Sequence, residues 1–96
     1  MAKFNALNPI LHAPLRLAII SLLISVDEAD FNYLLEQTES TKGNLSVQLT
    51  KLKQAGYIKI NKGYKNNYPH TSCSILPKGI EAFEAYVSDL KSYIRK

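Results

Sequence analysis

The sequence predicts an α+β fold that is mainly α, with three helices, a β-hairpin and a final helix in one domain of residues 1–96. Apolar residues recur at helical intervals of three and four in four separate segments of the chain. Between the third and fourth of these segments the period changes to two, which is typical of strands. A length of 96 residues fits a single domain.

A domain of this size buries little surface and usually needs an additional source of stability. The chain has one cysteine, Cys73, so it cannot form an internal disulfide. Neither His12 nor His70 lies at a metal-ligand spacing from that cysteine, so no metal is expected. Cys73 is interpreted as a buried structural thiol, and a redox sensor is the alternative. Self-association is therefore the expected source of stability.

The first helix is expected to begin near Asn8–Pro9, because asparagine caps helices and proline suits their first turn. Pro14 delays or kinks that start. From there on the apolar positions are Leu15, Ala18, Ile19, Leu22 and Leu23, widened by Ile20 and Ile24. Such a broad apolar face indicates either a helix of the core or one that also contacts a second subunit.

Two further helices follow, joined by a short turn. Asp30 is expected to cap a helix over residues 31–37, with Phe31, Leu34 and Leu35 facing inward. Ser40 or Thr41 caps the next helix, which reaches Ala55 and buries one edge. Gly56 follows as the left-handed residue that ends it. The buried edge consists of Leu45, Leu49 and Leu52.

A hairpin over residues 57–76 is expected next. The alternation predicts Tyr57 outward, Ile58 inward, Lys59 outward and Ile60 inward. Glycine, asparagine and proline in residues 63–69 predict a turn-rich tip. Residues 70–76 form the returning strand.

The final helix is expected over residues 77–95, with proline near its start. Its apolar residues step by three and four over two heptads, as in a helix-pairing seam. This helix packs either on its own domain or against a second copy. The seam consists of Ile80, Phe83, Val87, Leu90 and Ile94.

Charge is distributed unevenly along the chain. The net charge is +4, yet residues 41–79 hold seven lysines and no aspartate or glutamate. Clustered positive charge attracts polyanions, and the resulting binding is salt-dependent. The alternative is a solvated, lysine-rich face without a partner.

Several classes of function are not expected from this sequence. It contains no nucleophile paired with a base, no glycine-rich phosphate loop and no carboxylate pair suited to a cleft, so neither an enzyme nor a cofactor is predicted. The apolar stretch "LRLAIISLLISV" is too short to span a bilayer and lacks a cleavage site for secretion. A cytoplasmic protein without a membrane partner is expected.

The order of elements is that of a winged helix-turn-helix. The segments "RLAIISLL", "FNYLLEQTESTKGNLSVQLTKLKQAGYIKI" and "YPHTSCSILPKGIEAFEAY" resemble the small stand-alone MarR/ArsR-like transcriptional regulators over roughly residues 8 to 95. "GNLSVQL" followed by "KLKQAGYI" is the most specific part. The resemblance implies a homodimer that binds double-stranded DNA, with the recognition helix at about 41–55, the wing at about 57–76 and a C-terminal dimerisation helix.

The chain departs from the family pattern in its recognition helix and in its wing. Gln48 replaces a frequent histidine and can still read adenine through two hydrogen bonds. Lys65 and His70 stand where arginine is commoner. Because lysine is less favoured in a narrow minor groove, this wing is expected to grip phosphates.

The resemblance also assigns candidate DNA contacts. The N-terminal part of a recognition helix reaches base edges, which points to Asn44, Ser46 and Gln48, with Val47 near a thymine methyl group. In the wing, the two tyrosines either contact DNA or pack the wing onto the domain. The full set of candidates is Thr41, Lys42, Asn44, Ser46, Val47, Gln48, Lys51, Lys62, Tyr64, Lys65, Asn66, Asn67 and His70.

A two-fold dimer predicts a palindromic operator with half-sites about 34 Å apart, or a multiple of that distance. Two alternatives stay open: a winged-helix module that binds protein, and a non-specific chromatin-like DNA-binding protein. The candidate dimer contacts are Leu15, Ile19, Ile80, Phe83, Val87, Leu90 and Ile94.

Overall fold

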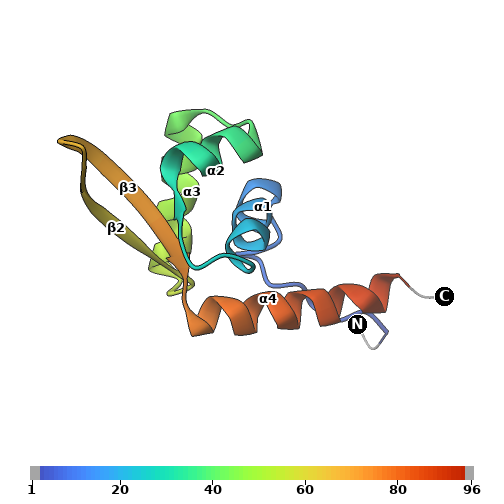
Figure 1. Ribbon diagram of the computed structural model, residues 1–96. Coiled ribbons are helices and arrows are strands. Elements are labelled where there is room, and N and C mark those ends of the chain that lie inside the picture. Colours follow the sequence, from blue (N-terminus) through green and yellow to red (C-terminus); the bar gives the residue numbers. More distant parts are fainter. Residues whose placement is uncertain (1–2, 95–96) are drawn as a thin grey trace.

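Three helices, a three-stranded antiparallel sheet and a long final helix make up the fold of the computed structural model, which describes residues 3–94 (Figure 1). The strand order is β1-β3-β2. The predicted α+β, mainly α winged-helix architecture is confirmed. The elements are α1 (Pro14–Leu23), β1 (Ala29–Asp30), α2 (Phe31–Thr38), α3 (Lys42–Gln54), β2 (Ile58–Lys65), β3 (Tyr68–Ile75), α4 (Pro77–Leu90) and the short 3-10 helix η1 (Lys91–Tyr93).

The core lies where α1, α2 and α3 meet the sheet. The three leucines predicted for the inner edge of α3 are buried, as is Leu34 of α2. Phe31 and Leu35 are partly buried against the same cluster. The predicted inward positions of both helices are therefore confirmed. The fully buried large side chains are Leu11, Ile19, Ile20, Leu23, Leu34, Leu45, Leu52, Ile58 and Cys73.

The first helix starts at Pro14 and not at Asn8, which corrects the prediction. The Asn8 Oδ1 atom accepts hydrogen bonds from the backbone N–H groups of Ile10 (2.8 Å) and Leu11 (3.3 Å) and so caps a separate turn. Ala13 is extended, with φ −149° and ψ 124°, and separates this turn from α1. Pro14 then occupies the first helical turn, where its missing N–H costs nothing.

The starts of α2 and α3 are fixed by local capping, as predicted. The Asp30 carboxylate accepts from the Tyr33 N–H at 2.7 Å, and the Thr41 hydroxyl accepts from the Asn44 N–H at 3.2 Å. Glu39 has φ 52°, the left-handed conformation that ends α2. These bonds within four residues set the directions in which both helices begin.

The strands of the hairpin are longer and its tip is tighter than predicted. Gly63 and Tyr64 pair with His70 and Pro69, so several residues assigned to the turn-rich tip belong to the strands. The chain reverses at Asn66 and Asn67, whose φ angles of 54° and 65° correspond to a two-residue type I′ turn. Asparagine tolerates this conformation better than most residues, which explains the short tip.

Tyr57 faces inward and is only 8% exposed, which contradicts its predicted outward position. It precedes β2, and its hydroxyl accepts a hydrogen bond from the Asn8 side chain at 2.8 Å. The Nζ atom of Lys78 lies 5.9 Å from the centre of its ring. The strand alternation does not extend back to Tyr57 because its side chain is held by the turn before α1 and by α4.

Helix α4 ends at Leu90, short of the predicted residue 95, which lies outside the described residues. The segment before α1 lies alongside its C-terminal end. The Asn5 N–H donates to the Ser92 hydroxyl at 3.0 Å, and the Tyr93 hydroxyl donates to the Asn5 carbonyl at 2.7 Å. These contacts accompany the change from α-helix to the tighter η1. The helix runs past α1, and its C-terminal end extends beyond the other helices (Figure 1). The molecule measures 55 × 25 × 22 Å.

Cys73 is fully buried in β3, where it faces the core. Burial raises the pKa of its thiol to about 11, and the nearby Glu28 carboxylate acts in the same direction. The thiol is therefore protonated and unreactive at neutral pH, consistent with a structural residue. Within residues 3–94, no helix combines the length and apolar character needed to cross a bilayer.

Candidate nucleic-acid interface

The exposed face of α3 lies opposite its three buried leucines. With 100° between successive residues, the middle of this face holds Gly43, Val47, Thr50 and Gln54. Val47 is 50% exposed although it is apolar. An exposed apolar side chain between polar ones suits a surface that reads base edges, where it can contact a thymine methyl group.

The first turn of α3 is available to an anion. Thr41 and Lys42 are exposed at this end of the helix, whose initial N–H groups have no partners within the helix. Lys51 is exposed one turn before the other end. These positions fit contacts with two stretches of the phosphate backbone on either side of a groove.

Gln48 lies at the edge of the exposed face and is tied to α1 by an unpredicted residue. The Arg16 Nη1 atom donates to Gln48 Oε1 at 2.7 Å, and Gln48 Nε2 donates to Asn44 Oδ1 at 3.0 Å. Gln48 is half-buried, whereas Asn44 is exposed. Asn44 and Gln48, two of the candidate base contacts, therefore form one hydrogen-bonded pair, and Arg16 of α1 holds Gln48 in place.

The register of the hairpin separates its residues into two faces. Because side chains alternate along a strand, Lys62 and Tyr64 share one face with Ile60, which packs on the core. By the same alternation Lys65 and His70 lie on the opposite face. The structure thus brings Lys62 and Tyr64 towards α3 but leaves Lys65 and His70 on the side away from it.

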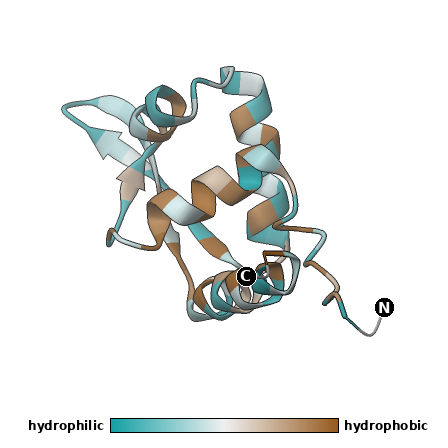
Figure 2. Ribbon diagram, turned by 90° about the vertical axis from the view of Figure 1, so that its right-hand side faces the viewer, coloured by the Kyte–Doolittle hydropathy of each residue, from teal (hydrophilic) through white to brown (hydrophobic). Residues whose placement is uncertain are grey.

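The two wing tyrosines do not pack the wing onto the domain. Tyr64 is 80% exposed and Tyr68 is 75% exposed. Together with Asn66 and Asn67 they form a polar and aromatic outer end of the hairpin. Figure 2 shows that this end is hydrophilic, whereas hydrophobic residues gather in the helices.

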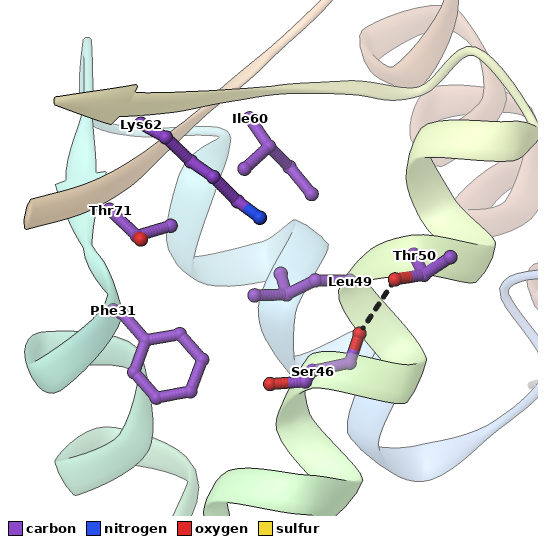
Figure 3. A pocket seen from close by; sticks show the side chains of 7 residues that line it. All are labelled: Phe31, Ser46, Leu49, Thr50, Ile60, Lys62 and Thr71. Atoms are coloured by element: carbon purple, nitrogen blue, oxygen red, sulfur yellow. Dashed lines mark hydrogen bonds between the residues drawn. The ribbon is translucent and has the colours of Figure 1, made fainter.

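A pocket of about 170 Å³ separates α3 from the wing (Figure 3). The Lys62 side chain extends from β2 into this space, towards the helix. The hydroxyl groups of Ser46 and Thr71 border it, and Phe31 and Leu49 form its apolar wall. The Thr50 hydroxyl is engaged with the Ser46 carbonyl at 3.0 Å. An ammonium group beside free hydroxyls is suited to a phosphate oxygen.

Three residues of this surface were not predicted from the sequence. Thr50 and Gln54 lie at helical spacing after Val47, so the period of α3 could have predicted that they share its exposed face. No sequence pattern pointed to Arg16, because it lies 32 residues from Gln48 and approaches it only in the folded chain.

The residues predicted to form a subunit contact have mixed positions. Ile19 is fully buried in the core, so it cannot contact a second chain, which corrects that assignment. Ile80 and Val87 are 36% and 37% exposed, and Ile94, beyond the end of α4, is 59% exposed. Leu15, Phe83 and Leu90 are half-buried against the core.

An open groove of about 400 Å³ runs between α1 and α4. Its lining is predominantly apolar, and three of the predicted seam residues contribute to it: Phe83, Val87 and Leu90. The residues that line it are Pro14, Leu17, Ala18, Ser21, Phe83, Tyr86, Val87 and Leu90.

Comparisons with known proteins agree with this geometry. Residues 15–94 match a family model described as a winged helix DNA-binding domain. An uncharacterized protein of Methanocaldococcus jannaschii is 32% identical over 81 residues, which cover 84% of this chain and 88% of that protein.

Two solved structures are similar to this chain. A transcriptional regulator homologue from Pyrococcus horikoshii OT3 superimposes with a TM-score of 0.82 at 30% identity, covering 88% of this chain and 84% of that one. NadR in complex with 4-hydroxyphenylacetate gives a TM-score of 0.72 at 22% identity, covering 90% of this chain and 63% of that one, and supports the fold alone. The family match and the arrangement of α3 and its wing lead to one conclusion: the chain belongs to the winged helix DNA-binding domain family.

Proposed function

We propose that the protein is a homodimeric transcriptional regulator that recognises a specific sequence in double-stranded DNA. The observation that carries the proposal is the absence of carboxylates from α3 and the hairpin, which together hold six of the seven lysines of residues 41–79. The exposed face of α3 and one face of the wing flank a common pocket. This arrangement supports α3 in the major groove with Lys62 on a phosphate.

The similarity to a regulator homologue from Pyrococcus horikoshii OT3 supports a role in transcription. The exposed apolar residues of α4 and the groove beside them support a dimer through this helix. A two-fold axis through the interface would present two copies of α3 to a palindromic operator, with half-sites about 34 Å apart or a multiple of that distance. The proposal assigns the chain no catalytic role.

The proposal is tested by selecting bound duplexes from a random pool and then measuring affinity over a series of salt concentrations. We expect enrichment of one palindromic sequence, and an affinity that falls about 1000-fold or more between about 50 and 200 mM salt. A steep salt dependence without sequence enrichment would favour a chromatin-like protein. Absence of any salt-dependent binding would contradict the proposal and favour a protein-binding module.

Replacing Lys62 with alanine is expected to weaken binding to every duplex. Its ammonium group faces α3 and would neutralise a phosphate, so the slope of log affinity against log salt should become shallower by about 0.9. Lys59 provides a matched control, because it is exposed on the other face of the same strand. Lys59→Ala should leave the slope unchanged, and equal effects of both substitutions would argue against the proposed orientation of the wing.

A further inference from the structure

We propose that Arg16 is a positioning residue that determines which base edges the recognition helix prefers, by holding the Gln48 amide in one orientation. The inference rests on the proposed function, because it concerns how α3 reads DNA. Arg16 lies in the first turn of α1 and is half-buried behind Gln48. It acts through Gln48 and Asn44.

The guanidinium group of Arg16 is held in place on its other side. Its Nε atom donates to the Ile10 carbonyl at 2.6 Å, and its Nη2 atom donates to the Pro9 carbonyl at 3.4 Å. Both acceptors belong to the turn before α1. The remaining nitrogen, Nη1, is thereby directed at Gln48 Oε1. A planar group with three partners has little freedom to rotate, so it fixes the amide that it contacts.

This contact determines the hydrogen-bonding character of the exposed pair. Arginine has donors only, so its partner atom in Gln48 must be the oxygen. The Gln48 nitrogen then faces Asn44 and donates to its Oδ1 atom. Each amide has its oxygen engaged within the protein. Each oxygen keeps one lone pair, whereas three hydrogens remain for a ligand: the two on Asn44 Nδ2 and the second one on Gln48 Nε2.

A pair that offers more donors than acceptors prefers bases that offer acceptors. In the major groove guanine presents two acceptors, adenine one acceptor and one donor, and cytosine a donor alone among its polar groups. The arrangement therefore favours guanine and disfavours cytosine at the contacted position. It also replaces the expectation that Gln48 reads adenine with both amide atoms, because Arg16 and Asn44 already hold these two atoms in hydrogen bonds within the protein.

The experiment compares Arg16→Met with Lys51→Met, by selecting duplexes and by measuring affinity after each base change in the selected site. Both substitutions remove one positive charge, but none of the described hydrogen bonds joins Lys51 to Gln48. Wild-type protein should select guanine at one position of each half-site and bind its adenine substitute about 10-fold more weakly. Arg16→Met should reduce this ratio to about 3-fold or less. Lys51→Met should weaken binding to all duplexes and keep the ratio.

Two further variants keep the inference falsifiable if Arg16→Met does not fold. Gln48→Met breaks the same chain of hydrogen bonds from the other end and should also lose the guanine preference. Arg16→Lys restores a donor to Gln48 and should recover part of it. An unchanged guanine-to-adenine ratio in folded Arg16→Met and Gln48→Met, or selection of cytosine by wild-type protein, would overturn the inference.

A measurement without DNA separates this inference from the proposed function. The side-chain amide resonances of Asn44 and Gln48 in free protein should shift in Arg16→Met and stay in place in Lys51→Met. Shifted resonances in a protein that selects no duplex would reject the proposed function while leaving the positioning by Arg16 intact. Unshifted resonances would overturn the positioning itself.

Discussion

Replacing Gly79 with alanine is expected to lower the free energy of unfolding by about 3 kcal/mol, at the upper end of the usual cost of overpacking. Gly79 is buried in the first turn of α4, where this helix meets the start of β2. A Cβ atom at this position would lie 2.3 Å from the Tyr57 carbonyl oxygen and 3.0 Å from the Ile75 side chain. Because a backbone oxygen cannot rotate away, α4 must shift as a whole.

The expected loss of stability is large because the Tyr57 carbonyl oxygen also accepts a backbone hydrogen bond. The Leu76 N–H donates to the same Tyr57 oxygen at 2.9 Å, so a displaced helix also strains that hydrogen bond. For a domain of this length, about 3 kcal/mol corresponds to a decrease in the melting temperature of roughly 12–24 °C. Thermal and urea denaturation followed by circular dichroism would measure the loss at a fixed protein concentration, since oligomers have concentration-dependent stability.

Gly43→Ala is the matched control for this prediction. Gly43 is also in the first turn of a helix, yet a Cβ atom there would meet nothing within 4 Å. Alanine should therefore raise the free energy of unfolding by about 0.5–1 kcal/mol, through helix propensity alone. If both substitutions stabilised the protein, the close contact between α4 and β2 would not exist in solution.

Val87→Asp is expected to convert the proposed dimer into monomers. Val87 is 37% exposed and lines the groove between α1 and α4. In a two-fold interface each substitution occurs twice, and a carboxylate buried without a partner costs several kcal/mol. We expect the dimer dissociation constant to rise by about 100-fold or more, which corresponds to ~3 kcal/mol. Sedimentation equilibrium over a range of concentrations would measure it.

Ser88→Asp is the control for this experiment. Ser88 is exposed and lies 100° further around α4, on the side turned away from the groove. It adds the same charge and should leave the dissociation constant unchanged. We avoid Leu90 in this test because it also packs on the core of its own chain. A Val87→Asp protein that remains as dimeric as wild type would exclude the groove side of α4 as the interface.

The predictions that the structure confirms depend on interactions between close neighbours in the sequence. Asp30 and Thr41 cap their helices through N–H groups three residues away. The buried leucines of α3 follow from its period alone. The order of helices and strands, and the winged-helix fold, could be predicted because each element carries its own local pattern.

The errors arose where residues distant in the sequence compete with a local pattern. Asn8 followed by Pro9 is typical of a helix start, but Asn8 caps a separate turn. Its side chain also donates to the Tyr57 hydroxyl, 49 residues away. The same contact turns Tyr57 inward against the alternation of its strand. The short β1 exists only because Ala29 and Asp30 pair with β3.

The sequence by itself determined the fold, the position of α3 and the positive charge of its surroundings, because helix caps, periodicity and charge need only neighbouring residues. Only the tertiary structure decided which side chains face the same way. It placed Lys62 and Lys65 on opposite faces of the hairpin, buried Ile19 in the core, and brought Arg16 within hydrogen-bond distance of Gln48. These outcomes depend on how elements pack against each other, and no local pattern records that packing.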